Sequence, residues 1–190
     1  MIDIERIMDK ACDDHVRLIE SVRAHKRNTQ ELIRILLDVF ENKNKVFFCG
    51  NGGSSADCHH FAGEFLGRYN KNRQSLPAIN LSSDSATITC IANDYSFDNI
   101  FDRQLEALGN EGDALIAFTT SGKSQNVINA LKIAKIKKMK TISFCGDFTD
   151  YLSVYSDLLI SFETHETARI QEAYYFTLHC ICEIIDEHFE

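Results

Sequence analysis

The sequence contains little proline and glycine, with one proline and nine glycines among 190 residues. This composition leaves little material for linkers or low-complexity tracts, and no segment repeats with the period of a solenoid. With 44% hydrophobic and 25% charged residues, the chain suits one domain with its own core. We therefore expect a single domain over residues 1–190.

Long apolar runs and long basic runs are also missing. No stretch approaches the length of about 18 apolar residues that indicates a membrane span, and residues 1–10 form an acidic amphipathic segment rather than a signal peptide. The formal net charge is −8, and the most basic neighbourhood lies at Lys137 and Lys138. This charge argues against nucleic acid and anionic membranes as partners. We expect a cytoplasmic protein.

The seven cysteines include no Cys-x-x-Cys pair, which argues against a zinc site built from thiolates. Most of them lie in apolar runs, so we expect reduced thiols buried in the core. They are Cys12, Cys49, Cys58, Cys90, Cys145, Cys180 and Cys182.

Hydrophobic periodicity predicts alternating helices and strands. Five short apolar runs have the pattern of strands buried on both faces of a parallel sheet: 45–50, 76–82, 113–121, 140–146 and 156–162. Helical spacing is found at 2–24, 29–40, 54–69, 85–93, 97–108, 124–138 and 167–189. The alternation predicts a layered α/β domain with right-handed crossovers, in which a helical pair (1–42) precedes the α/β core (45–190).

Two loops combine glycine with hydroxyl residues where a strand leads into a helix, "GNGGSS" (50–55) and "TTSGKS" (119–124). Free backbone N–H groups and the helix dipole attract phosphate at such a place. The ordinary alternative is that Ser54 and Ser124 cap their helices and the glycines serve the turns. Two such loops together favour a phosphate ester. The segment "TTSGKS" does not match a nucleotide P-loop, since Ala117 stands where that motif needs glycine.

His60 and Glu64 lie four residues apart, so they share one face of the predicted helix. Imidazole nitrogen and carboxylate oxygen suit zinc, although a surface hydrogen bond is the common role of such a pair and His59 is a neighbouring candidate. Gln171 and His179 lie about 80° and about 12 Å apart on the last helix. They would have to lean together, or come from different subunits, to share a metal; a core histidine is the alternative for His179.

Four segments carry a family resemblance: "CGNGGSSADCHHFAGEFLGRY", "NRQSLPAINLSSDSATITCIANDYSFDNIF", "EGDALIAFTTSGKSQNVINAL" and "RIQEAYYFTLH". The chain resembles the phosphoheptose isomerases, members of the sugar isomerase (SIS) class. The resemblance implies a three-layer SIS-type fold, with a five-stranded parallel sheet flanked by helices and long N-terminal helices. It also implies a homotetramer with active sites at subunit interfaces, where helices meet across chains.

The activity implied by the resemblance is that of an aldose–ketose isomerase. Such an enzyme converts D-sedoheptulose 7-phosphate to D-glycero-D-manno-heptose 7-phosphate through an enediol, for heptose used in surface polysaccharide or lipopolysaccharide. One Zn²⁺ per subunit would be held by His60, Glu64, Gln171 and His179, with Glu64 as base and His179 as acid. The implied substrate-binding residues are Asn51, Gly52, Gly53, Ser54, Glu64, Arg68, Asn93, Asp94, Thr119, Thr120, Ser121, Ser124 and Gln171.

Some positions depart from the family pattern. Gly63 replaces one carboxylate of a common Glu-Glu pair, Lys123 stands where asparagine is usual, and Thr167 and Ala168 stand where several members have an acid. These changes bear on substrate choice. Two alternatives stay open: an isomerase of another sugar phosphate, and a non-catalytic SIS sensor or adaptor. The adaptors that bind the replication initiator are similar, but they lack the Glu and the His of the metal set.

Overall fold

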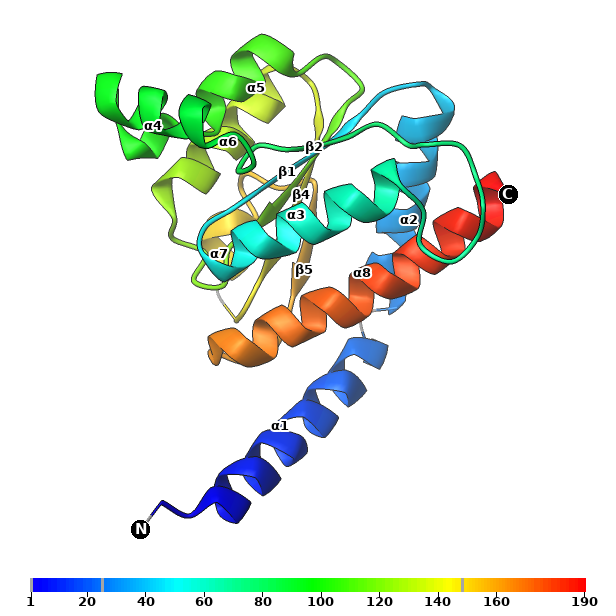
Figure 1. The fold of residues 1–190 in the computed structure, drawn as a ribbon, viewed down its shortest axis with the longest axis vertical. Helices are drawn as coiled ribbons and strands as arrows, with labels where there is room; N and C mark the ends of the chain where they lie inside the picture. Colours follow the sequence, from blue (N-terminus) through cyan, green and yellow to red (C-terminus); the bar gives the residue numbers. More distant parts are fainter. Residues whose placement is uncertain (1, 25, 148) are drawn as a thin grey trace.

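The computed structural model describes residues 2–24, 26–147 and 149–190. Its centre is a parallel sheet of five strands in the order β2-β1-β3-β4-β5, as the sequence predicts (Figure 1). The strands are β1 Val46–Gly50, β2 Ala78–Asn80, β3 Ala114–Phe118, β4 Lys140–Cys145 and β5 Leu158–Ser161. After β1 the chain runs outward to β2 and then returns to the other side of β1 as β3. The strand order therefore reverses between β1 and β3, where ligands of such sheets bind.

The helices are α1 Ile4–Ala24, α2 Lys26–Glu41, α3 Gly53–Leu66, α4 Ser85–Asp94, the 3₁₀ helix η1 Phe97–Asn99, α5 Asp102–Leu108, α6 Gln125–Ile136, α7 Thr149–Leu152 and α8 Thr167–Phe189. Most helices lie close to the predicted ranges, but α7 was not predicted and the predicted helix 97–108 is divided in two. The division into a helical pair (1–42) and an α/β core (45–190) stays a prediction. Helix α2 contributes to the same hydrophobic core as the sheet.

Alternate residues of each buried strand serve two separate cores, as the period of a strand requires. Phe48 faces α2, α3 and α8, whereas its neighbour Phe47 faces α5 and α6. Sheet and helices thus form three layers (Figure 1). The arrangement places α3 and α8 together on one face of the sheet.

Three expectations about local structure and burial are wrong. The predicted helix 97–108 is broken because Ile100 and Phe101 turn into the core, at 2% and 1% exposure, between η1 and α5. The edge strand β5 is not buried on both faces, since it pairs only with β4 and Ile160 alone is fully buried. All seven cysteines are free, but Cys12 and Cys90 are exposed because they lie on outward faces of α1 and α4.

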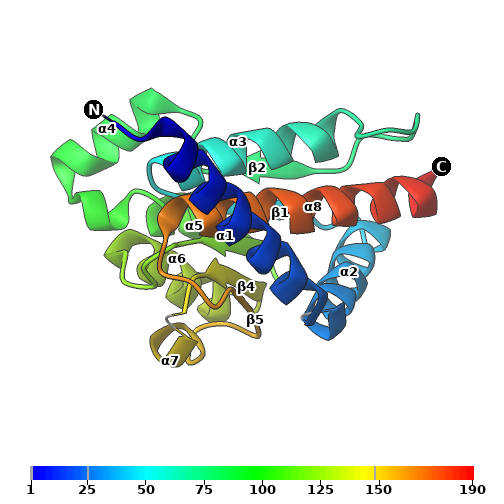
Figure 2. The same cartoon turned by 90° about the horizontal axis from the view of Figure 1, so that it is seen from below.

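Helix α1 extends away from the rest of the molecule and crosses α8 (Figures 1 and 2). Its C-terminal half packs through Leu18 and Val22, which are 6% and 8% exposed. Its N-terminal half carries Ile4, Ile7 and Met8, which are more than half exposed.

In the described residues, no helix is both long enough and apolar enough to cross a membrane.

The aromatic centre of the first core gives a stability prediction. The ring of Phe118 is 1% exposed and lies 5.1–6.3 Å from the rings of Tyr174, Phe144 and Phe48. Phe118→Ala should therefore lower the free energy of unfolding by about 3–5 kcal/mol, measured by urea denaturation. The exposed Ile136→Ala serves as control and should change it by less than about 0.5 kcal/mol. Equal small losses in both variants would contradict this packing.

Candidate functional site

The two glycine–hydroxyl loops are joined across the point where the strand order reverses. Asn51 follows β1, and its side-chain amide pairs with the amide of Asn126 in the first turn of α6. The two reciprocal N–H···O bonds are 2.8 and 2.9 Å long, and Asn126 is 2% exposed. No sequence motif pointed to Asn126. This pair holds both loops in one cradle at the carboxyl ends of β1 and β3.

The N-cap alternative is wrong for Ser54, whereas Ser124 does occupy the N-cap position of α6. Both helices lie wholly within the described residues. Helix α3 begins after Gly52, whose φ of +57° favours glycine, and no side chain caps it. Ser54 lies inside its first turn. The side chain of Ser124 makes no capping hydrogen bond to the backbone of α6, and its hydroxyl accepts a hydrogen bond from Thr119 Oγ1 at 3.4 Å. The amino end of α3 is thus a suitable place for an anion.

A cluster of ionisable groups lies where α3 faces α8. His60 Nε2 is 3.1 Å from His179 Nε2 and 3.3 Å from Glu64 Oε1. The ring of Tyr69 stacks on His179, with centroids 5.3 Å apart and planes inclined by 21°. His179 is therefore half-buried against the predicted site and does not sit inside an apolar core. Its contacts favour the site interpretation over that of a core histidine.

Gln171 reaches α3 one turn nearer the phosphate-type loop. Its Nε2 donates to Asp57 Oδ2 at 3.3 Å, and a Cβ added to Gly53 would lie only 2.2 Å from the same nitrogen. Gln171 and His179 thus both face α3 within one chain. Residues of α1, α3 and α8 line an open groove of roughly 460 Å³ at this contact: His15, Gly53, Ala56, Asp57, Gln171, Glu172 and Tyr175.

Burial shifts two pKa values in this cluster. The pKa of His179 is lowered by burial first and by the nearby His60 second, against the opposing charge of Glu64. A neutral imidazole, the form that binds a metal, is thereby favoured. Burial also raises the pKa of Asp57 to about 6, although hydrogen bonds from Gln171 and Tyr175 and the charge of His60 oppose it.

The donor types of the predicted zinc set fit the metal. Neighbouring ligands of tetrahedral zinc with bonds of 2.0–2.1 Å lie about 3.3 Å apart, which matches the two contacts of His60 Nε2. However, in the described part of the chain, no group of three or more His, Cys, Asp or Glu side chains is arranged to hold a metal ion. Gln171 also points its amide nitrogen at Asp57. The zinc site stays a prediction that would require side-chain rotations.

Other predicted site residues form their hydrogen bonds outside this cluster. Arg68 is exposed and donates to the carbonyl of Asn70. Asn93 and Asp94 are exposed at the end of α4, where their side chains bond to each other at 2.8 Å. In the second loop, Ser121 Oγ accepts from the Lys123 N–H, and the Thr120 carbonyl accepts from the Gly146 N–H.

Sequence reasoning missed Asp57 and Tyr175, although helical spacing contained the signal. Asp57 precedes His60 by three residues and Glu64 by seven, so all three share one face of α3. Tyr175 lies four residues from both Gln171 and His179 on α8, and its hydroxyl donates to Asp57. The two helix faces are therefore polar over several turns.

The raised pKa of Asp57 predicts a pH-dependent stability difference. The folded protein holds this proton up to about pH 6, whereas the unfolded chain loses it near 3.8, so stability falls as pH rises between these values. Metal-free Asp57→Asn lacks this loss. Relative to wild type it should gain up to about 2 kcal/mol between pH 4.5 and pH 8, measured by urea unfolding. A constant difference across this range would contradict the raised pKa.

Comparison with known proteins identifies the family. A model of the SIS domain matches residues 12–146. A phosphoheptose isomerase of Aliarcobacter butzleri is 46% identical over 153 residues, which are 80% of this chain and 81% of that protein. One from Helicobacter pylori strain P12 is 41% identical over 172 residues, 90% of each chain. The solved phosphoheptose isomerase of Francisella tularensis, 34% identical, matches with a TM-score of 0.92 over 98% of this chain and all of that one. The chain therefore belongs to the phosphoheptose isomerase family of SIS-domain proteins.

Proposed function

We propose that this protein is an aldose–ketose isomerase that converts D-sedoheptulose 7-phosphate to D-glycero-D-manno-heptose 7-phosphate. The observation that carries the proposal is the contact of His60, Glu64 and His179 beside two linked glycine–hydroxyl loops, in a chain of this family. The product would supply heptose for a surface polysaccharide or lipopolysaccharide. Because all seven cysteines are free thiols, the proposal places the reaction in the reducing cytoplasm.

The substrate phosphate would bind at the cradle formed by the two loops. The first turn of α3 offers backbone N–H groups and the positive end of a helix dipole. Hydroxyls of Thr119, Ser121 and Ser124 come from the neighbouring loop. Binding at this remote end would orient the open-chain sugar so that its first carbons reach the groups between α3 and α8.

Isomerisation requires a base beside the carbons and an acid beside the oxygens. The Glu64 carboxylate would take a proton from C1 of the ketose and return a proton to C2, with an enediol between these steps. His179 would donate a proton to the C2 oxygen as the enediol forms, and would take back the proton that the C1 hydroxyl loses when C2 is protonated. The stacked ring of Tyr69 and the contact with His60 would hold the imidazole of His179 in place.

We further propose that one zinc ion per subunit is bound by His60, Glu64, Gln171 and His179. When bound, the metal would supply positive charge to the developing oxyanion. Glu64 as a ligand is less basic, so it would have to leave the metal to act as base. Gln171 would have to turn its amide oxygen toward the same point while its nitrogen keeps Asp57 as acceptor.

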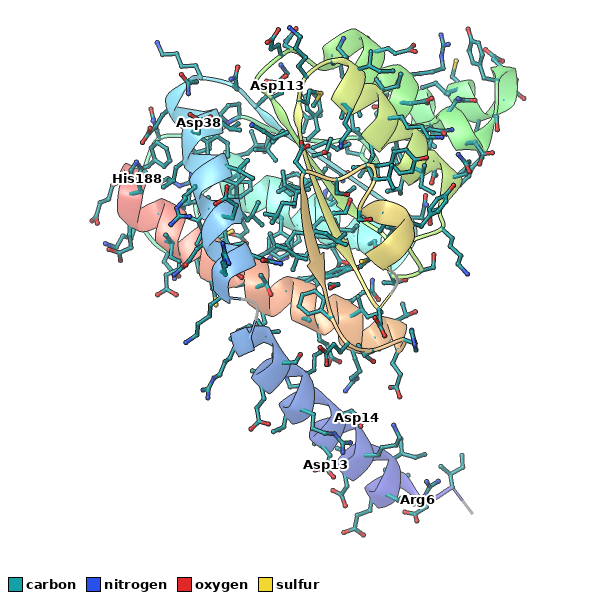
Figure 3. All side chains as sticks on the ribbon, turned by 180° about the vertical axis from the view of Figure 1, so that it is seen from behind. Arg6, Asp13, Asp14, Asp38, Asp113 and His188 are labelled. Atoms are coloured by element: carbon teal, nitrogen blue, oxygen red, sulfur yellow. The ribbon has the colours of Figure 1, made fainter. Side chains whose placement is uncertain are left out.

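The proposed assembly is a homotetramer with active sites at subunit interfaces. Helix α1 extends into solvent and carries the apolar side chains of Ile4, Ile7 and Met8 (Figure 3 labels Arg6 and Asp13 on the same helix). A helix with such a face gains stability by packing against another surface. The hydrogen bonds of the exposed Arg68, Asn93 and Asp94 go to residues outside the cluster of their own chain, which is consistent with service to a neighbouring site.

Turnover of sedoheptulose 7-phosphate tests the function directly. Proton NMR of the sugar with purified protein, metal-free and with added zinc, should show anomeric signals of an aldose heptose 7-phosphate. Glu64→Gln and His179→Ala should each lower kcat by at least about 100-fold while the protein stays folded, because each removes a proton-transfer group. Binding of the sugar phosphate without any conversion in wild type would favour the sensor or adaptor instead.

The assembly is tested by sedimentation velocity. Wild type should sediment as four chains of 21.6 kDa. Ile7→Asp should give smaller species, because it places a charge on the apolar face of α1, whereas the exposed Glu5→Ala on the same helix should leave the tetramer intact. A single-chain wild type, or an Ile7→Asp variant that sediments like wild type, would count against this role of α1.

A further inference from the structure

A buried ion pair joins the loop after α3 to the C-terminal part of α8. Arg73 Nε donates to Asp186 Oδ1 at 2.7 Å, and the two side chains are 0% and 1% exposed. Burying two charges is costly unless each is fully hydrogen-bonded. The remaining bonds of both groups therefore reveal which parts of the fold the pair connects.

Arg73 binds the carboxyl end of α3. Its Nη2 donates to the Glu64 carbonyl at 2.8 Å, and its Nη1 donates to the carbonyls of Phe65 at 2.9 Å and Gly67 at 3.3 Å. The last carbonyls of a helix lack partners within the helix and carry the negative end of its dipole. A guanidinium with its fork of donors suits this place. It is hydrogen-bonded directly to the backbone of the proposed base.

Asp186 fixes the other side of this connection. It follows His179 by seven residues on α8, about 20° short of two full turns, so both side chains lie on the same face. Its Oδ2 accepts the backbone N–H groups of Asn70 and Lys71 at 2.6 and 2.8 Å. The loop that follows α3 is thereby anchored to α8.

The anchored loop carries Tyr69. This residue lies between Gly67, whose carbonyl accepts from Arg73, and Asn70, whose N–H binds Asp186. Its ring lies against His179, with centroids 5.3 Å apart and an interplanar angle of 21°. The same ion pair thus contacts the backbone of Glu64 on one helix and fixes the ring against which His179 packs on the other.

We propose that Arg73 and Asp186 are positioning residues of the active site, here named the α3–α8 clamp. The clamp sets the separation and register of the two helices, so that His60 and Glu64 face His179 at contact distance. It touches neither substrate nor metal and acts through the backbone of Glu64 and the ring of Tyr69. This inference rests on the proposed isomerase function.

The chain offers a matched control for a merely stabilising role. Asp113 is also 1% exposed, and it accepts the N–H groups of Lys45 and Asn110 at 3.0 and 2.8 Å and the Lys45 ammonium at 2.7 Å. It has the same kinds of partner as Asp186, two backbone N–H groups and one cation. It precedes β3 at the amino end of the sheet, opposite the site, and Figure 3 shows it well apart from His188 on α8.

The experiment compares wild type, Asp186→Asn, Arg73→Lys and Asp113→Asn. All four proteins are assayed at a temperature at which their urea unfolding curves show that they are folded without urea. The readouts are kcat, KM and the affinity of the metal-free protein for zinc, measured by competition with a chelating dye. We expect both clamp variants to lose about 10–100-fold in kcat and in zinc affinity, the usual effect of supporting partners of a metal site, with little change in KM. Asp113→Asn should lose stability but retain kcat and zinc affinity.

Arg73→Lys keeps the charge but cannot bridge the carbonyls and Asp186 together, so it serves as the test if Asp186→Asn does not fold. If the clamp variants have the same kcat and zinc affinity as Asp113→Asn, the proposal is overturned. The ion pair of Arg73 and Asp186 would then only stabilise the fold. Absence of turnover in wild type would instead refute the proposed function. Zinc affinity would still decide whether the clamp positions the cluster.

Discussion

The contact between α3 and α8 is the constraint on which the candidate site depends. Neither helix alone brings the groups together: α3 supplies His60 and Glu64, and α8 supplies His179. The side chains meet because both helices pack on the same face of the sheet, where apolar residues such as Phe61 and Leu178 bury the interface between them. His60, Glu64 and His179 are only partly buried beside this interface. Packing energy thus positions the chemical groups.

The sheet topology adds the second part of the site. Since the strand order reverses between β1 and β3, the loops that follow these strands open a crevice that no crossover fills. Asn51 and Asn126 join the two loops there, and Gly53 allows the side chain of Gln171 to approach closely. The two loops and the cluster of His60, Glu64 and His179 are thereby placed side by side, as the proposed isomerase requires.

Much of this arrangement could be predicted from local sequence pattern. The spacing of His60 and Glu64 indicated a shared helix face, and the apolar runs indicated a parallel sheet. Contacts between distant segments left no such pattern: Arg73 and Asp186 are 113 residues apart, and Asn51 and Asn126 are 75 apart. The break at Ile100 was also hidden, because tertiary burial overrode helical spacing. The roles of Arg68, Asn93 and Asp94 stay predictions.

The central claim is that the groups between α3 and α8 move a proton between two sugar carbons through an enediol. It is tested most directly by incubating sedoheptulose 7-phosphate with the wild-type protein in D₂O and recording the proton NMR spectrum of the product. The Glu64 side chain is 22% exposed, so its proton should exchange with solvent. The account predicts an aldose heptose 7-phosphate that carries deuterium at C2. An aldose product that retains only protium at C2 would contradict it, as would the absence of any product.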